Sequence, residues 1–205
     1  MRKLIAAAFV SMDGVMQAPG GPEEDPSEKF ALGGWTAPFW AEDTNPFMGV
    51  FEQSSDHPFD LLLGRKTYDI FAAYWPVHQE IPIGPLFDRV TKYVATSAPK
   101  SLGWQNSVAL SGDVPAEIAK LKQGDGPDLL TQGSSVLLHA LFQHDLVDEL
   151  RLMTFPVVLG RGKRWFDEGA APAGFVLDKT LTFSTGVTSS LYRRAGEVRT
   201  GTIGG

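Results

Sequence analysis

Cysteine is absent from this chain of 205 residues. Its absence excludes disulfide bonds, cysteine nucleophiles and metal sites built from thiolates. The chain also lacks any apolar run near the roughly 18 residues that a membrane-spanning helix needs. Basic residues are few, with 18 Lys and Arg against 24 Asp and Glu, and phosphate neutralisation needs a basic face. We therefore expect a soluble, cytoplasmic globular protein that does not bind nucleic acid or membranes.

Histidine is also scarce, and no metal-ligand pattern occurs. The four histidines are His57, His78, His139 and His144. There is no HExxH motif, and the last two lie five residues apart, so they do not share a helix face. We predict no metal site, and helix capping or surface exposure for the last two.

The N-terminal segment MRKLIAAAFVSMDG resembles a signal peptide only superficially. Its apolar stretch is short and is not followed by a cleavage segment, so residues 3–10 are predicted to form a central strand. Residues 17–58 are rich in proline, glycine and aromatic residues. This composition predicts a long ordered loop with a short helix around residues 46–55.

From residue 60 onward, apolar runs alternate with helix-like patterns. We expect strands at 60–64, 92–97, 107–112, 128–133 and 148–160, helices at 66–74, 114–123 and 134–145, and a hairpin at 175–194 that turns at Ser184-Thr185-Gly186. This order predicts a three-layer α/β domain over residues 1–195 and a flexible tail over 196–205. Its central sheet should be mainly parallel, with an antiparallel C-terminal hairpin.

Small polar and basic residues follow three of the predicted strands. They are Gly64, Arg65, Lys66 and Thr67 in LLLGRKT, Thr96 and Ser97 in YVATS, and Gly133, Ser134 and Ser135 in LLTQGSSVL. Carboxyl ends of parallel strands meet at one edge of a sheet, so these residues together predict a phosphate-binding surface. Two alternatives stay open, because such junctions are often only well-capped helices and two adjacent cations are often a solvated turn.

Neither G-x-G-x-x-G after a strand nor G-x-x-x-x-G-K-[ST] occurs, which argues against a Rossmann dehydrogenase or a P-loop kinase. The order of the segments instead resembles the dihydrofolate-reductase-like superfamily. The similar segments are SMDGV, the aromatic loop, LLLGRKTYDIF, KYVATS, LLTQGSSVLLHALFQHDLVDELRL and FPVVLGRGKRWF, and the nearest branch is the reductase domain of riboflavin biosynthesis. The resemblance implies that the residues after the three strands bind NADPH. Arg65 and Lys66 would hold its phosphates, including the 2′-phosphate, which suits the forked donors of arginine.

One acidic residue of the family has no match here. True dihydrofolate reductases carry a buried carboxylate on the first helix, whereas Glu42 and Asp43 fall near that position without matching it, so dihydrofolate is not the expected substrate. The resemblance places Asp13 nearest the nicotinamide, as the candidate catalytic acid. The alternative is that Asp13-Gly14 only makes a turn.

Aromatic residues of the long loop are candidates for substrate contacts. Trp35 and Trp40, together with Phe39, could stack on a planar ligand or close the core beneath the loop. The acidic run Glu23-Glu24-Asp25 is predicted to be a solvated loop tip.

These observations predict an NADPH-dependent reductase that transfers hydride to a C=N or C=O bond of a small heterocycle. The resemblance points to pyrimidine- or pteridine-like compounds, as in the 5-amino-6-(5-phosphoribosylamino)uracil reductase of riboflavin biosynthesis. The alternative is a nucleotide-binding protein of the same fold without turnover. A homodimer is also expected, with the apolar segment LRLMTFPVVLG as the strand that pairs two copies.

Overall fold

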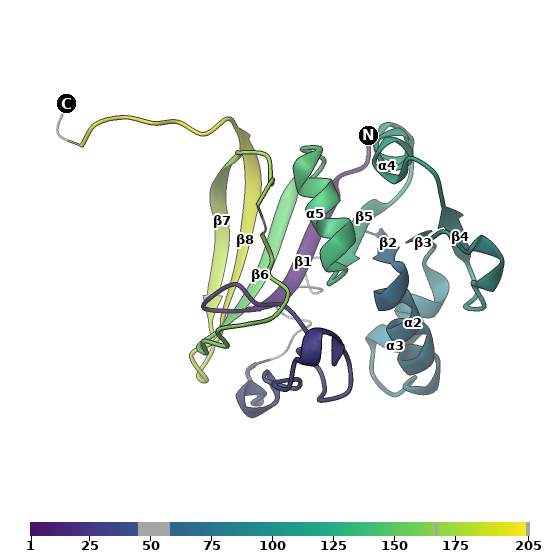
Figure 1. The fold of residues 1–205 in the computed structure, drawn as a ribbon, viewed down its shortest axis with the longest axis horizontal. Coiled ribbons are helices and arrows are strands. Elements are labelled where there is room, and N and C mark those ends of the chain that lie inside the picture. The colour runs from purple at the N-terminus through teal and green to yellow at the C-terminus, as the bar shows by residue number, and fades with distance from the viewer. Residues whose placement is uncertain (45–57, 167, 204–205) are drawn as a thin grey trace.

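The structure is a computed structural model that describes residues 1–44, 58–166 and 168–203. Eight strands in these ranges form a single sheet in the order β4-β3-β2-β5-β1-β6-β8-β7 (Figure 1). The strands are β1 (Leu4–Ser11), β2 (Phe59–Gly64), β3 (Lys92–Ala95), β4 (Ser107–Leu110), β5 (Asp128–Gln132), β6 (Glu149–Phe155), β7 (Gly174–Thr182) and β8 (Thr188–Gly196). The helix expected around residues 46–55 lies outside the described residues.

Helices and short turns connect these strands. The helices are α2 (Arg65–Tyr74), α3 (Ile83–Arg89), α4 (Val114–Gln123) and α5 (Ser135–Gln143), and the 3-10 turns are η1 (Ser27–Lys29), η2 (Ala37–Phe39), η4 (Trp75–Val77) and η5 (Pro99–Ser101). Helix α3 was not predicted. Its segment IGPLFDR follows an N-cap at Pro82 and contains Gly84 and Pro85 in its first turn, and both residue types normally interrupt helices.

The sheet is mainly parallel, as predicted. Strands β4, β3, β2, β5, β1 and β6 run parallel, and β8 and β7 add an antiparallel hairpin at one edge. In β2, Leu61, Leu62 and Leu63 are all fully buried, so both faces of this strand are covered. Each such side chain stabilises the fold by about 1.5–3 kcal/mol, which explains the uninterrupted apolar run.

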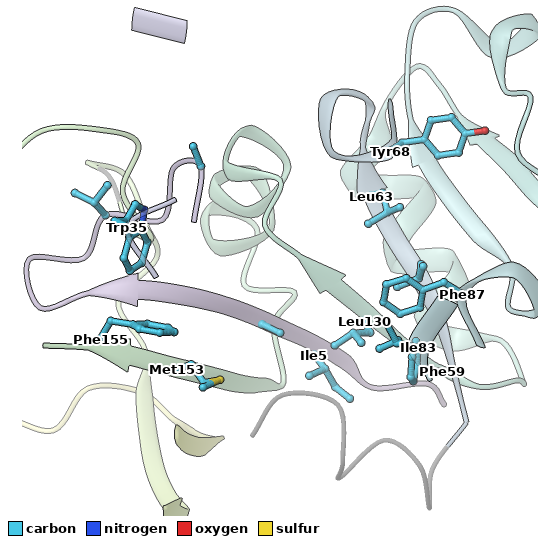
Figure 2. Close-up of a cluster of buried hydrophobic side chains, with 14 of the residues drawn as sticks. Ile5, Trp35, Phe59, Leu63, Tyr68, Ile83, Phe87, Leu130, Met153 and Phe155 are labelled. Atoms are coloured by element: carbon cyan, nitrogen blue, oxygen red, sulfur yellow. The ribbon is translucent and has the colours of Figure 1, made fainter. Parts of the chain in front are cut away.

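Alternate residues of β1 face two separate cores, which gives the fold its three layers. On one face, Ile5 packs in a cluster with Tyr68 of α2 and Phe87 of α3. On the opposite face, Leu4 packs in a cluster with Ile118 of α4 and Leu138 of α5. Figure 2 shows the first cluster, in which Trp35 and Phe155 lie on one side and Tyr68 and Phe87 on the other, with Ile5 and Leu130 between them.

Two predictions about the segment 148–160 were wrong. Strand β6 ends at Phe155, because Pro156 has no N–H to continue the ladder. The same strand cannot pair two copies of the chain, because β1 and β8 occupy both of its edges. The outer strands of the described sheet are β4 and β7. A homodimer itself stays a prediction.

The C-terminal end of the described chain leaves the sheet after β8. Residues 197–203 contain no helix or strand and extend away from the body of the protein (Figure 1). None of the helices in the described ranges is long and apolar enough to cross a lipid bilayer.

Candidate functional site

The segments that follow the neighbouring strands β1 and β5 pack on opposite faces of the sheet. The loop after β1 packs Phe30 and Trp35 on the α2–α3 face, whereas β5 leads into α5 on the other face. Strand β5 pairs with β1 only as far as Ala7, opposite Gln132, while β6 accompanies β1 to Ser11. Ligands of open α/β sheets bind beyond the carboxyl ends of strands that diverge in this way. We call the region beyond the ends of these two strands the crevice between β1 and β5.

The ends of β2 and β5 are joined by side-chain hydrogen bonds. The Gly64 N–H donates to Ser134 Oγ at 2.9 Å, and the Ser134 N–H donates to Thr67 Oγ1 at 3.1 Å. Gly133 and Ser134 both have positive φ, at 68° and 58°, so the chain turns sharply before α5. The structure thus brings together four predicted residues, Gly64, Thr67, Gly133 and Ser134, which we call the β2–β5 junction.

Helices α2 and α5 both begin at this junction, and neither has a side-chain cap. The hydroxyl of Ser134 is already engaged by Gly64, and Ser135 is the first residue of α5. The N–H groups of a first helical turn have no partner within the helix. Here no capping side chain covers them, so they can bind an anion such as a pyrophosphate.

The end of β3 lies next to α2. Thr96 is buried, and its hydroxyl accepts from the Ala98 N–H at 3.1 Å, whereas Ser97 is exposed. Arg65 reaches this loop and donates to Ser101 Oγ, and its Nε lies 2.9 Å from both carboxylate oxygens of Asp69. The guanidinium therefore lies beside Ala98 and Ser101, in the loop that follows Thr96 and Ser97, with Asp69 as its ion-pair partner.

Lys66 turns toward the loop after β1, where it contacts the carboxylate of Asp25. Lys163 Nζ lies 2.7 Å from the same carboxylate. Burial raises the pKa of Asp25, but hydrogen bonds from Lys163, Lys66 and Ser27 outweigh it and hold that pKa well below the usual range. The ammonium groups of Lys66 and Lys163 thus share the carboxylate of Asp25 beside the start of α2.

The prediction that Asp25 belongs to a solvated loop tip was wrong. Asp25 is only 9 % exposed, whereas Glu23 is exposed as expected. Gln17 holds the same loop, because its Nε2 donates to the carbonyls of Asp25 and Ser27 at 3.0 Å each. Asp25 and Lys163 are 138 positions apart, and no local pattern in the sequence points to their contact.

Asp13 receives several hydrogen bonds from its own chain. Its carboxylate accepts from Ser11 Oγ at 2.6 Å and from the N–H groups of Leu159 and Gly160 at 3.1 and 2.9 Å. Partial burial raises the pKa of Asp13, but these hydrogen bonds outweigh it and lower the pKa to about 2. The turn at Asp13-Gly14 is also present, with the Gly14 N–H donating to Ser11 O. Asp13 is therefore ionised at neutral pH, and its role in catalysis stays a prediction.

The aromatic residues of the long loop pack around Phe155. The rings of Trp35, Phe39 and Trp40 all make edge-to-face contacts with it. Trp35 is 8 % exposed and its indole N–H donates to Gln17 O, whereas Trp40 is 37 % exposed. The packing of Trp35 corresponds to the core-closing alternative, and a substrate contact of either tryptophan stays a prediction.

Of the two acidic residues near the position of the pterin-binding acid, Asp43 is bound by the β7–β8 hairpin. Asp43 accepts from the N–H and the hydroxyl of Ser184 at 2.8 Å each, at the tip of the β7–β8 hairpin, and Glu42 is exposed. Within residues 1–44, 58–166 and 168–203, no group of three or more His, Asp or Glu side chains is arranged to hold a metal ion.

A comparison with protein families matches residues 2–189 to the RibD C-terminal domain. The chain belongs to this family. The resemblance expected from the strand-end segments is thus confirmed over nearly the whole chain.

Two proteins of Bacillus subtilis are similar to this member of the RibD C-terminal domain family. YyaP is 27% identical over 195 residues, which cover 93% of this chain and 94% of YyaP. YwjB is 29% identical over 167 residues, which cover 82% of this chain and 84% of YwjB. Both are described as uncharacterized proteins.

Solved structures share the fold of this RibD-family chain. A putative riboflavin biosynthesis protein from Shewanella superposes with a TM-score of 0.69, at 18% identity, covering 94% of this chain and 99% of its own. A pyrimidine reductase-like protein from Corynebacterium diphtheriae has a TM-score of 0.60 at 11% identity, covering 96% of this chain and 93% of its own. Dihydrofolate reductase from Enterococcus faecalis, complexed with NADP(H) and RAB-propyl, has a TM-score of 0.56 at 18% identity, covering 94% of this chain and 96% of its own. The fold is therefore the dihydrofolate-reductase-like α/β fold.

Proposed function

We propose that the protein is an NADPH-dependent reductase that acts on a C=N or C=O bond of a ribosylated pyrimidine. The observation that carries the proposal is the β2–β5 junction, where two uncapped helices begin side by side, in a chain of the RibD C-terminal domain family. Two solved neighbours are named for riboflavin biosynthesis and pyrimidine reduction, and a third holds NADP(H).

The residues at the strand ends fit this cofactor. The first-turn N–H groups of α2 and α5 would hold the pyrophosphate, next to Gly133, whose positive φ of 68° shapes the turn before α5. Arg65 and Lys66 would bind the 2′-phosphate, and Thr96 and Ser97 would contact the adenosine. Both cations are paired with carboxylates, so binding would exchange Asp69 and Asp25 for the phosphate dianion.

When bound, NADPH supplies the hydride, which adds to the carbon of the C=N or C=O bond, and a proton adds to the nitrogen or oxygen. A carboxyl group of pKa about 2 is already ionised at neutral pH and has no proton to donate. Asp13 would therefore act as an ionised acceptor that orients a water or a substrate hydroxyl. The proton itself would come from that water.

The experiment is to follow NADPH oxidation with 5-amino-6-(5-phosphoribosylamino)uracil, and with dihydrofolate as the contrasting substrate. We expect oxidation with the first compound and little or none with dihydrofolate, because Asp43 is bound to the hairpin tip. Binding of NADPH without oxidation in the presence of any aminopyrimidine would support the alternative function, a nucleotide-binding protein. The low pKa of Asp13 is the observation that favours this alternative.

A further inference from the structure

The last residue of β5, Gln132, carries a buried side-chain oxygen that has no hydrogen-bond partner in the described part of the chain. Gln132 is 9 % exposed, and its Oε1 is buried with no hydrogen-bond partner among the described residues. Buried side-chain amides are nearly always hydrogen-bonded, because an unpaired buried acceptor destabilises the folded state. A strand that retains such a group therefore calls for an explanation other than stability.

The position of Gln132 is in the crevice between β1 and β5. It lies opposite Ala7 of β1 and directly before Gly133 of the β2–β5 junction. Side chains two residues apart on a strand share a face, so Gln132 faces the same side as Leu130. Leu130 belongs to the cluster that contains Trp35 and Phe155 (Figure 2). The amide thus faces the layer of the long loop, where β1 continues without a β5 neighbour.

The neighbouring residue Thr131 offers a matched comparison. Its hydroxyl is also buried without a hydrogen-bond partner among the described residues. Because it alternates with Gln132, it faces the opposite side of the sheet, with Leu129 and the α5 residue Leu138. That face is closed by α5, whereas the face of Gln132 adjoins the crevice.

We propose that Gln132 recognises an amide group of the ring that binds in this crevice. Its Oε1 would accept a hydrogen bond from an N–H of the ligand, and its Nε2 would donate to the adjacent carbonyl oxygen. A carboxamide and a ring lactam both present this pair of groups. The nicotinamide of the cofactor carries the first and a uracil-type ring carries the second, so the inference rests on the proposed function and extends it to ligand recognition.

The test replaces Gln132 by methionine, which has a similar length and no amide. We expect Gln132→Met to raise the thermal midpoint of the ligand-free protein and to weaken recognition of the amide-bearing ligand about tenfold. A binding site that recognises its ligand through a hydrogen bond loses affinity in this way, because removal of one partner leaves the polar group of the other partner unpaired. Thr131→Val is the control, and should raise the midpoint without changing recognition. Gln132→Leu also removes the amide but has a side chain of different shape. It should likewise raise the thermal midpoint and weaken recognition of the amide-bearing ligand.

Two measurements distinguish the two sources of the amide. The first is the affinity for NADPH and for its 3-acetylpyridine analogue, which lacks the carboxamide N–H. If Gln132 binds the nicotinamide, the wild type prefers NADPH about tenfold and Gln132→Met loses that preference. The second is KM for 5-amino-6-(5-phosphoribosylamino)uracil, which rises in Gln132→Met at unchanged NADPH affinity if Gln132 binds the substrate.

The outcomes also separate this inference from the proposed function. Wild-type protein that binds NADPH, together with a folded Gln132→Met variant of unchanged cofactor preference and unchanged KM, would overturn the role of Gln132 alone. Wild-type protein that does not bind NADPH at all would overturn the proposed function, and the role of Gln132 with it.

Discussion

Helices α4 and α5 both follow strands of the same sheet and pack on the same face, yet they begin differently. The N-cap residue of α4 is Asp113, whose carboxylate accepts from the Ala116 N–H at 3.1 Å. The N-cap residue of α5 is Ser134, whose hydroxyl accepts from the Gly64 N–H of β2 and caps nothing in its own helix. Helix α2 is likewise uncapped and begins at the same junction.

The capped first turn of α4 serves the fold, whereas the uncapped first turns of α2 and α5, which meet at the β2–β5 junction, are available to a ligand. A capped first turn has its N–H groups satisfied by its own chain, and the cap stabilises the helix by about 1 kcal/mol. An uncapped first turn keeps the positive end of the helix open to an anion. The two open helices adjoin the crevice between β1 and β5, whereas α4 follows the outer strand β4.

The largest expected effect is that of Gly133→Val. Gly133 has φ of 68°, and valine is strained there although its Cβ would have ordinary contacts, 3.7 Å from Thr67 Oγ1. Relief of this strain would move the N–H groups at the start of α5. We expect NADPH affinity to fall at least about a hundredfold, or roughly 2.7 kcal/mol, as measured by titration.

The matched control for this variant is Gly112→Val, in the turn before α4. Gly112 has φ of 77° and open space around its Cα, so it should lose similar stability, roughly 1–2 kcal/mol, and keep full NADPH affinity. Equal cofactor affinity in the two folded variants would remove the start of α5 from the site.

The next largest effect concerns Arg65, at the first position of α2. Arg65→Ala should weaken NADPH about ten- to a hundredfold and NADH much less, because a charge-assisted hydrogen bond contributes about 1.5–3 kcal/mol. Lys120→Ala removes a paired cation from α4 and should change neither affinity. Equal losses for both cofactors in Arg65→Ala would place Arg65 on the shared pyrophosphate instead.

Local sequence patterns predicted most of the fold and the meeting of the strand ends. The buried run LLLG and the breakers Pro115 and Gly124 act on their own neighbours, so their consequences are visible in the sequence. The parallel order then brings Gly64 and Gly133 together, as expected for carboxyl ends of neighbouring strands.

Contacts that depend on distant loops could not be predicted in this way. The pairing of Asp25 with Lys66 and Lys163 joins three separate segments, and an acidic run in a Gly/Pro-rich loop is typical of a solvated tip. Gln132 is one residue of an apolar strand, and only its burial reveals that its amide has no partner. The roles of such polar residues depend on contacts in the tertiary structure, which a local sequence pattern does not show.

Asp13 lies just after β1, and its carboxylate either takes part in turnover or only accepts hydrogen bonds that stabilise the fold. Like Asp113, it accepts hydrogen bonds from backbone N–H groups, here those of Leu159 and Gly160. Asp13→Asn replaces one acceptor oxygen by a donor, and we expect turnover to fall about tenfold, or roughly 1.4 kcal/mol of barrier, with little change in NADPH affinity. Unimpaired turnover in this variant would reduce Asp13 to the structural role that Asp113 has.

The stabilising contribution of Asp13 in the wild type should depend on pH. The pKa of Asp13 is about 2 in the folded protein and about 3.9 when unfolded, so its ionised form stabilises the fold above that higher value. This contribution is lost as the pH falls toward 2. The difference in unfolding free energy between wild type and Asp13→Asn should therefore shrink from pH 5 to pH 2, as measured by denaturant titration.

The smallest effect is expected at α4 itself, from Asp113→Ala. Removal of the cap leaves the Ala116 N–H without its acceptor, which should lower the free energy of unfolding by about 1 kcal/mol. NADPH affinity and turnover should not change, because α4 follows the outer strand β4. Ser134→Ala is the counterpart at α5: its hydroxyl joins Gly64 to the junction, so both stability and NADPH affinity should fall. If Asp113→Ala lowered NADPH affinity as much as Ser134→Ala, capped and uncapped helices would contribute equally to cofactor binding. The distinction between them would then not hold.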